Sequence, residues 1–130
     1  MAYIKLSLIN KLYRLCFCII WCLVCRWTPK QLNKWRILVL RLFGATISAK
    51  VTVYSSARIW MPSNLSMGQS SCLGPNVKIY NVSQVSIGRN TIVSQDAEIC
   101  TPSHDFTVPE FYLISNPISI GSNCWIAAGA

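Results

Sequence analysis

A hydrophobic residue recurs every six positions through the second half of the chain. The recurring residues fall into sets of three, and each set restarts twenty residues after the one before. They are Ile47, Val53 and Ile59; Met67, Leu73 and Ile79; Ile87, Val93 and Ile99; and finally Ile120 and Ile126. Four of the six glycines directly follow one of these residues: Gly68, Gly74, Gly88 and Gly121. A short fixed period of this kind predicts a solenoid.

A six-residue period predicts a mainly β fold, the parallel β-helix. Each hexad should form one short strand and one corner, so three hexads complete a triangular coil and the coils stack. The recurring aliphatic residue points inward, and a small or modest residue four positions later fits the narrowing corner. These corner residues are Val51, Ala57, Ser63, Ser71, Val77, Ser83, Thr91, Ala97, Cys124 and Ala130. Such a prism is filled by its own side chains, so an active site must lie on loops or between subunits.

The register breaks once, between Ile99 and Ile120. Comparable links in the earlier coils are eight residues long, so about thirteen residues loop out of the third coil, over about 101–117. The chain's single histidine, His104, stands at the base of this excursion, followed by Asp105. The β-helix should cover residues 44–130, and it stops inside its fourth coil at Ala130. We therefore expect an incomplete β-helix, from either a fragment or a truncated gene product.

Residues 1–43 have a different pattern and are expected to be helical. Eleven consecutive apolar residues run from Leu15 to Cys25 between two arginines, too few for a membrane span, which needs about 20. This run either lies at the surface of an anionic membrane or packs on the domain or on a partner subunit. A second helix is predicted over about 29–43, with Thr28 and Gln31 as a capping box and Gly44 as the stop.

Charge and cysteine content narrow the function classes. The chain carries 12 Lys or Arg against 4 Asp or Glu, and eight of the twelve basic residues lie in residues 1–43, which hold no acidic one. Residues 44–130 are neutral overall, and they contain no recognisable nucleic-acid-binding motif. This argues against nucleic-acid binding. Seven cysteines, an odd number, argue against a disulfide framework and indicate a reducing compartment. Their spacing is not that of a zinc site, so we expect no metal.

The hexads, the run Ser103-His104-Asp105 and the segment from Ile118 to Ile126 resemble the hexapeptide-repeat acyltransferases. The nearest branch is similar to the colanic-acid-type acetyltransferases of exopolysaccharide synthesis, which residues 27–130 resemble. The resemblance implies a left-handed coil, a homotrimer, acetyl-CoA as the donor, a hydroxyl acceptor and one histidine as general base. It places the base at His104 and the coenzyme contacts at Trp125 and Ala128.

The chemistry suits an imidazole. An alcohol attacks a thioester poorly unless its proton is removed, and imidazole, with an ordinary pKa near 6.5, does this best near neutral pH. A backbone N–H at Ala128 is the candidate for stabilising the oxyanion. Asp105 either orients the imidazole or is an ordinary turn residue. Asn81 either binds the acceptor or forms a hydrogen bond with a corner carbonyl. Trp60 either lines the substrate groove or packs within the structure.

Two functions follow as expectations. One is an O-acetyltransferase that transfers acetyl from acetyl-CoA to a sugar or lipid-linked sugar of an exopolysaccharide precursor. The alternative is a non-catalytic trimeric scaffold that lacks a complete coenzyme site. The cationic leader and a cytosolic donor together predict a cytoplasmic protein, peripheral at the inner face of the cytoplasmic membrane.

Overall fold

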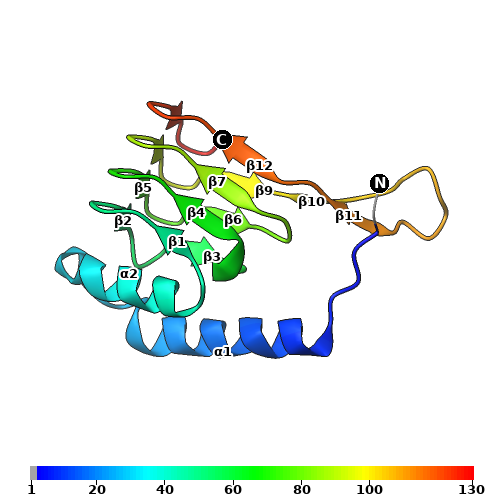
Figure 1. Ribbon diagram of the computed structural model, residues 1–130, viewed down its shortest axis with the longest axis horizontal. Helices are drawn as coiled ribbons and strands as arrows, with labels where there is room; N and C mark the ends of the chain where they lie inside the picture. The colour runs from blue at the N-terminus through cyan, green and yellow to red at the C-terminus, as the bar shows by residue number, and fades with distance from the viewer. Residues whose placement is uncertain (1–2) are drawn as a thin grey trace.

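Residues 3–130, described here from a computed structural model, form a three-sided parallel β-helix with two helices at its first coil (Figure 1). The first sheet contains β1 (Thr46–Ile47), β4 (Leu65–Met67), β7 (Val85–Ile87) and β12 (Ile118–Ile120). The second contains β2 (Thr52–Val53), β5 (Cys72–Leu73), β8 (Ile92–Val93) and β13 (Trp125–Ile126). The third contains β3 (Arg58–Ile59), β6 (Lys78–Tyr80) and β9 (Glu98–Cys100). The predicted fold is confirmed.

The register of the strands explains the twenty-residue repeat. Met67 of β4 pairs with Ile47 below it and with Ile87 above it, each twenty positions away. After the excursion, Ile87 pairs with Ile120, 33 positions on. All nine recurring aliphatic residues from Ile47 to Ile99 are buried, and Ile120 and Ile126 pack against that core. The inward-facing period was therefore predicted correctly.

One vertex of the prism departs from the prediction. Six of the eight small residues from Val51 to Ala97 are buried in corners, but Ser63 is exposed and Ser83 is half-buried. At this vertex the link to the next coil is two residues longer than the six-residue period. In the first coil this longer link contains the turn η2 (Pro62–Asn64). The space inside this vertex is filled by Leu65, Val85 and Asn81 instead, all almost completely buried.

The second predicted helix is shorter than expected, and its capping box was wrong. Residues Lys30–Leu32 form the short turn η1, and α2 covers Asn33–Leu42, ending before Gly44 at a φ of +98°. The Thr28 hydroxyl donates to the carbonyl of Cys25 and accepts a 2.8 Å bond from the Arg36 guanidinium, so it does not cap the helix. Residues of α2 join the core of the β-helix below its first coil.

The buried guanidinium of Arg36 ties α2 to the prism. It is fully buried and donates to the carbonyl oxygens of Val53 and Pro29, both at 2.8 Å. Burial lowers the pKa of Arg36 from its ordinary value. Asn33 adds a second clamp on β2, because its side chain donates to the carbonyl of Val51 at 2.8 Å and accepts from the amide of Val53 at 2.9 Å.

The apolar run belongs to a longer helix, α1 (Leu8–Val24), which begins at Ser7, whose hydroxyl accepts from the Asn10 amide at 3.1 Å. The helix runs along the edge of the third sheet, beside β3 (Figure 1). Only Phe17 and Trp21 of this helix are buried. Within residues 3–130, no helix has the length and apolar character needed to cross a bilayer.

Candidate functional site

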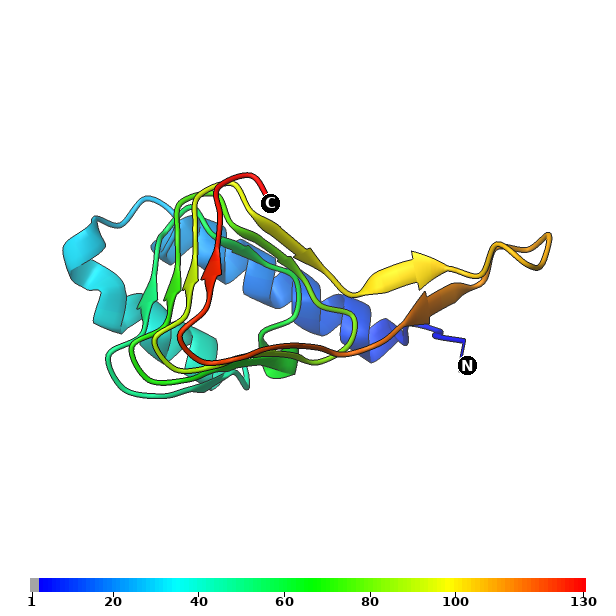
Figure 2. The same cartoon turned by 90° about the horizontal axis from the view of Figure 1, so that it is seen from above.

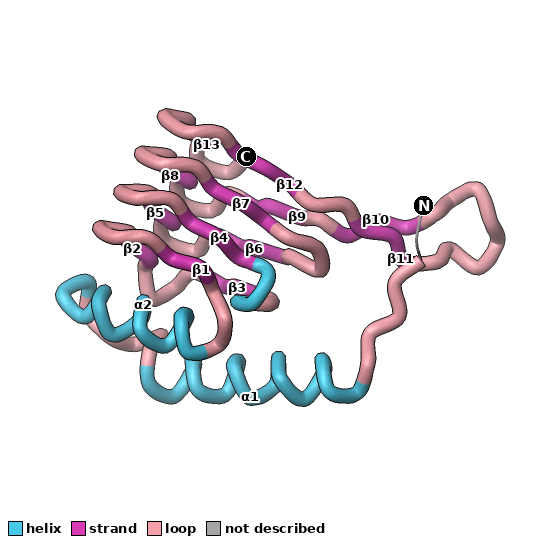
Figure 3. Tube along the Cα trace, viewed as in Figure 1, coloured by secondary structure: helices cyan, strands magenta, loops and turns pink. Residues whose placement is uncertain are grey.

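The excursion predicted around His104 is an antiparallel hairpin made of β10 (Pro102–His104) and β11 (Leu113–Ser115). It leaves the prism at the vertex between the third and first sheets and projects well beyond it (Figures 2 and 3). Its base is fastened to the second coil, because the amide of Thr101 donates to the carbonyl of Tyr80 at 3.0 Å. The hydroxyl of Ser115 donates to that of Thr101, also at 3.0 Å. The hairpin is therefore a firm projection and not a loose loop.

The imidazole of His104 is exposed on this hairpin and held by one hydrogen bond. Its Nδ1 lies 2.8 Å from the carbonyl oxygen of Phe111. A carbonyl oxygen only accepts hydrogen bonds, so Nδ1 carries the proton in the neutral ring and Nε2 keeps its lone pair. This is the tautomer that a general base requires, with the basic nitrogen facing away from the hairpin backbone.

The residue that supplies this carbonyl has an unusual backbone. Phe111 has a φ of +48°, in the left-handed region that a bulky side chain rarely adopts. The turn holds it there through a 3.2 Å bond from the Phe111 amide to the carbonyl of Val108. Strained residues of this kind often mark functional sites, and here the strain lies at the group that positions the imidazole.

The carboxylate of Asp105 does not contact His104. One of its oxygens accepts from the amide of Thr107 at 3.0 Å and from the Thr107 hydroxyl at 2.5 Å. These two bonds, with the hydroxyl bond the larger, lower the pKa of Asp105 from its ordinary value. Of the two roles considered for Asp105, the structure supports the turn residue, and the position beside the Nδ1 atom is occupied by a backbone carbonyl instead.

A contact that the sequence did not predict braces the hairpin from the N-terminal segment. Tyr3 forms an antiparallel bridge with Ile114, and its hydroxyl donates to the second carboxylate oxygen of Asp105 at 3.1 Å. This bond to Asp105 is the main cause of the raised pKa of Tyr3. The Tyr3 ring also packs on Tyr112, with centroids 4.6 Å apart. The segment before α1 thus acts as a third strand of the hairpin.

Trp125 and Ala128 lie on a different side of the prism. Trp125 points outward from β13 of the second sheet with 74% of its surface exposed, and its indole N–H donates to the hydroxyl of Ser94 at 2.7 Å. Ala128 is exposed in the corner that follows β13. The second sheet faces away from the vertex that carries the hairpin (Figure 2). A single chain therefore does not bring His104 together with these two residues.

The structure assigns Asn81 to the scaffold, the second of the two roles considered for it. Its side chain is completely buried, and its oxygen accepts from the Met61 amide at 2.9 Å. Its nitrogen donates to the carbonyls of Met61 and Asn64, at 2.9 and 3.0 Å. An amide with every hydrogen-bonding group used inside the vertex has none left for an acceptor sugar.

Trp60 packs edge-to-face on Tyr80, with ring centroids 5.1 Å apart, and the guanidinium of Arg14 lies 3.9 Å above its ring. It faces the space between α1 and the third sheet, and so it lines a groove away from the second sheet.

Comparison with curated proteins supports the resemblance. Over 101 residues the chain is 38% identical to the "Putative colanic acid biosynthesis acetyltransferase WcaF" of Escherichia coli strain K12, covering 78% of this chain and 56% of that protein. The protein of the same name from Shigella flexneri matches to the same extent. The chain is a homologue of these proteins. It spans just over half the length of the curated relatives it matches, and no family model matches it.

The fold is also found among solved structures. A maltose O-acetyltransferase from Clostridium difficile 630 superposes with a TM-score of 0.81 over 95% of this chain and 67% of that one, at 19% sequence identity. The three-sided coil of this protein is accordingly the left-handed β-helix that the resemblance implied. At this identity the match establishes the fold alone.

Proposed function

We propose that this protein is part of an O-acetyltransferase that transfers acetyl from acetyl-CoA to a sugar hydroxyl of an exopolysaccharide precursor. The observation that carries the proposal is the state of His104, which is exposed on a braced hairpin with Nδ1 tied to a carbonyl and Nε2 free. The homology to the WcaF proteins supports the reaction class and the polysaccharide context.

In this mechanism His104 is the general base. Its Nε2 accepts the proton of the acceptor hydroxyl while the hydroxyl oxygen attacks the acyl carbon, and the positive charge that forms on the ring is stabilised by the carbonyl of Phe111. Since that hydrogen bond strengthens as the imidazole becomes cationic, the carbonyl favours the transition state over the ground state. The proton then leaves for the departing thiolate by way of the same nitrogen.

The residues expected to bind the donor fit a long thioester only in part. Trp125 offers an exposed indole surface, and the corner at Ala128 is open to solvent, so an apolar arm has a wall to lie against and a backbone amide nearby. Acetyl-CoA supplies the activated acyl group when it is bound. Neither residue contacts His104, so this chain supplies the base and one wall from two separate faces.

That separation supports a homotrimer as the active form. When three prisms pack side by side, the hairpin of one subunit reaches the second sheet of its neighbour, so that the base and the donor wall come from different chains. The interior of the prism is filled by its own side chains, so it offers no internal pocket that could join His104 to the donor wall of the same chain.

The exposed apolar face of α1 supports attachment to the inner face of the cytoplasmic membrane. Its large exposed apolar residues are Leu8, Ile9, Leu12, Leu15, Ile19, Ile20, Leu23 and Val24. A helix with this face and flanking cations suits the boundary between headgroups and acyl chains of an anionic membrane. This location also suits a lipid-linked sugar as the acceptor.

The test uses the protein that contains this chain, with acetyl-CoA and candidate acceptor sugars, and follows coenzyme release and the acetylated product by chromatography and mass spectrometry. His104→Ala should lower kcat by about 10²- to 10⁴-fold with little change in KM for acetyl-CoA. Ser103→Ala, a neighbouring exposed residue of the same strand, is the matched control and should keep wild-type turnover. Wild-type turnover in His104→Ala would contradict the assignment, and a trimer with no turnover would favour the scaffold.

A further inference from the structure

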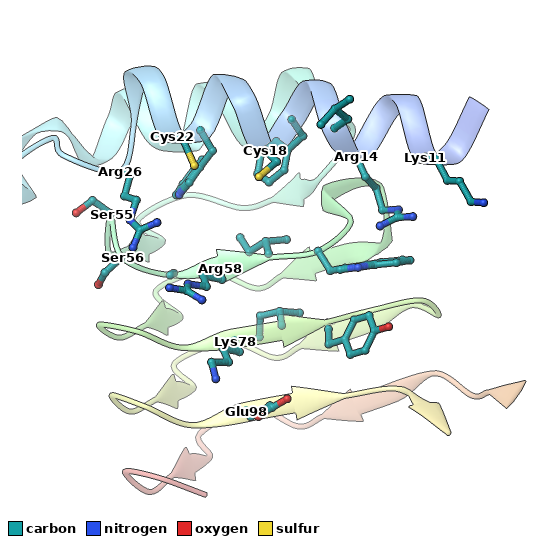
Figure 4. A pocket seen from close by; sticks show the side chains of 18 residues that line it. Lys11, Arg14, Cys18, Cys22, Arg26, Ser55, Ser56, Arg58, Lys78 and Glu98 are labelled. Atoms are coloured by element: carbon teal, nitrogen blue, oxygen red, sulfur yellow. The ribbon is translucent and has the colours of Figure 1, made fainter. Parts of the chain in front are cut away.

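A groove with a volume of about 870 Å³ lies between α1 and the outer face of the third sheet, on a different face from Trp125 and Ala128 (Figure 4). One wall is the helix, with Cys18, Trp21 and Cys22, and the floor is formed by β3 and β6. A volume of this size is within the range that holds a small-molecule ligand.

Positive charge gathers on this groove. Five cationic side chains line it, from α1, from the second residue after its end and from two strands of the sheet: Lys11, Arg14, Arg26, Arg58 and Lys78. Among residues 3–130, Glu98 is the one carboxylate in the lining. Two of the cations are adjacent across strands, since Arg58 and Lys78 are register partners in β3 and β6. Like charges directly opposite each other destabilise a sheet, and Glu98 of β9, the register partner of Lys78 on its other side, offsets one of these two charges.

Figure 4 shows how the cations are distributed along the groove. Arg26 reaches from the end of α1 toward Ser55 and Arg58, with Lys78 on the next strand and Glu98 on the strand after it, so this end carries three cations and one carboxylate. Lys11 and Arg14 form the other end. Guanidinium groups bind phosphate oxygens in pairs, and the serine hydroxyl adds a donor. The first end is therefore suited to a phosphate group.

The stretch between the two ends is apolar. The pKa of the Cys18 thiol on this wall is raised, by burial first and then by the neighbouring Cys22, which favours the neutral thiol. Trp21 is only 6% exposed, and its indole N–H has no hydrogen-bond partner within residues 3–130. An unpaired buried donor is costly, and a ligand oxygen that reached it would remove that cost.

An anionic lipid combines these two requirements, since it carries a phosphate beside a hydrocarbon chain. A soluble phosphate would leave the apolar wall exposed, and a neutral lipid would leave the cations unpaired. The apolar face of α1 runs alongside the groove, so a lipid of the bilayer lies within reach of it.

We propose that this groove binds one anionic membrane phospholipid, with its phosphate held by Arg26, Arg58 and Lys78 and its chain lying along α1. This inference deepens the proposed membrane attachment and is independent of acetyl transfer. The test uses a monomeric lipid. Binding to the groove is then measured separately from attachment of the protein to a membrane, and either can fail without the other.

The first experiment is titration calorimetry with dihexanoyl phosphatidylglycerol below its critical micelle concentration. The wild type should bind one lipid per chain. The double variant Arg58→Gln with Lys78→Gln should bind about 30-fold more weakly, because a cation near a lipid phosphate contributes about 1 kcal/mol. The matched control, Lys34→Gln with Arg89→Gln, removes the same charge from exposed positions outside the groove and should stay within about twofold. Equal weakening in both pairs would show adsorption by net charge and overturn the proposal.

The second experiment blocks the groove without changing its charge. Cys18 and Cys16 are both exposed on α1, and only Cys18 lines the groove. Cys18→Trp should abolish lipid binding, whereas Cys16→Trp should retain it, with both variants compared by their thermal unfolding midpoints. Unchanged binding in Cys18→Trp overturns the proposal.

Two further ligands test whether the groove recognises an anionic lipid, a soluble phosphate or a neutral lipid. Dihexanoyl phosphatidylcholine and inorganic phosphate should each bind at least about tenfold more weakly than phosphatidylglycerol, since each lacks one half of the recognised chemistry. Equal affinity for inorganic phosphate would make the ligand a soluble anion, and equal affinity for phosphatidylcholine would remove the role of charge. Groove variants that change the oligomeric state and leave lipid binding intact would assign the groove to a second copy of the chain.

Discussion

Replacing Gly88 by alanine should destabilise the β-helix where the chain returns from the hairpin of β10 and β11. Gly88 follows β7 and lies directly beneath the coil that begins with β12. A Cβ atom built there would lie 2.5 Å from both the carbonyl carbon of Gly121 and the amide nitrogen of Ser122. Ordinary contacts between carbon atoms are about 3.5–4.0 Å, so one coil would have to move by about 1 Å.

The upper coil cannot make this movement freely. The amide of Gly88 donates to the carbonyl of Ile120 at 2.8 Å, and the amide of Asn123 donates to the carbonyl of Arg89 at 2.8 Å. Overpacking costs about 1–3 kcal/mol, and each hydrogen bond stretched adds about 1 kcal/mol. Alanine recovers about 0.4–1 kcal/mol by restricting the unfolded chain. The net loss should be about 2–4 kcal/mol.

The assay is urea unfolding of the 130-residue chain followed by circular dichroism. Gly88→Ala should lower the urea midpoint with little change in slope. Gly121→Ala is the matched control, because it is the next glycine of the same column and its new Cβ would meet only the sulfur of Cys124, at 3.6 Å. That variant should be neutral or slightly more stable. If the two variants unfold at the same midpoint, the argument from close packing between coils is wrong.

Three further outcomes are expected. Ser70→Gly should raise the free energy of unfolding by up to about 1 kcal/mol, seen as a slightly higher urea midpoint, because Ser70 has a φ of +60° that glycine adopts without strain. Arg36→Leu should lower stability by about 3 kcal/mol or more, because it leaves buried carbonyls and the Thr28 hydroxyl without their donor, as urea unfolding would show. Thr107→Val should raise the pKa of Asp105 toward its ordinary value, measured by carboxyl NMR titration. Since a lowered carboxyl pKa stabilises the fold above the unfolded-state pKa and loses this effect as pH falls through the folded-state pKa, the variant should show a weaker stability loss on acidification.

The core of the β-helix could be predicted because its geometry repeats. Every coil places an inward side chain at the same three positions, so residues such as Val53, Leu73 and Val93 recur at a fixed spacing and are all fully buried. The vertex at Asn81 could not be predicted in the same way. Whether an asparagine faces inward there depends on the path of the two extra residues and on backbone groups of Met61 and Asn64.

The position of the candidate base could be predicted from the sequence, whereas its surroundings depend on contacts between distant segments. The position of His104 followed from the break in register. The group that fixes its Nδ1 atom is a backbone carbonyl, which no residue type reveals, and the brace from Tyr3 joins residues 102 positions apart. The prediction that Thr28 caps the second helix was wrong for a related reason. The buried guanidinium of Arg36 needs hydrogen-bond acceptors, and the Thr28 hydroxyl serves as one of them instead of capping the helix.

A count of charged residues does not show which cations of residues 1–43 are available to a partner. The sequence treats the eight basic residues of this segment as one positively charged surface, whereas the structure divides them by their partners. Arg36 is buried among carbonyl oxygens and is withdrawn from the surface, whereas Arg41 donates to the carbonyl of Ile47 at 2.7 Å and stays exposed. Lys11, Arg14 and Arg26 line the groove, where Arg58 and Lys78 join them from strands that the sequence counts as neutral. The charge available to a ligand thus depends on which cations the fold buries and which it brings together, and five of them line one groove between α1 and the third sheet.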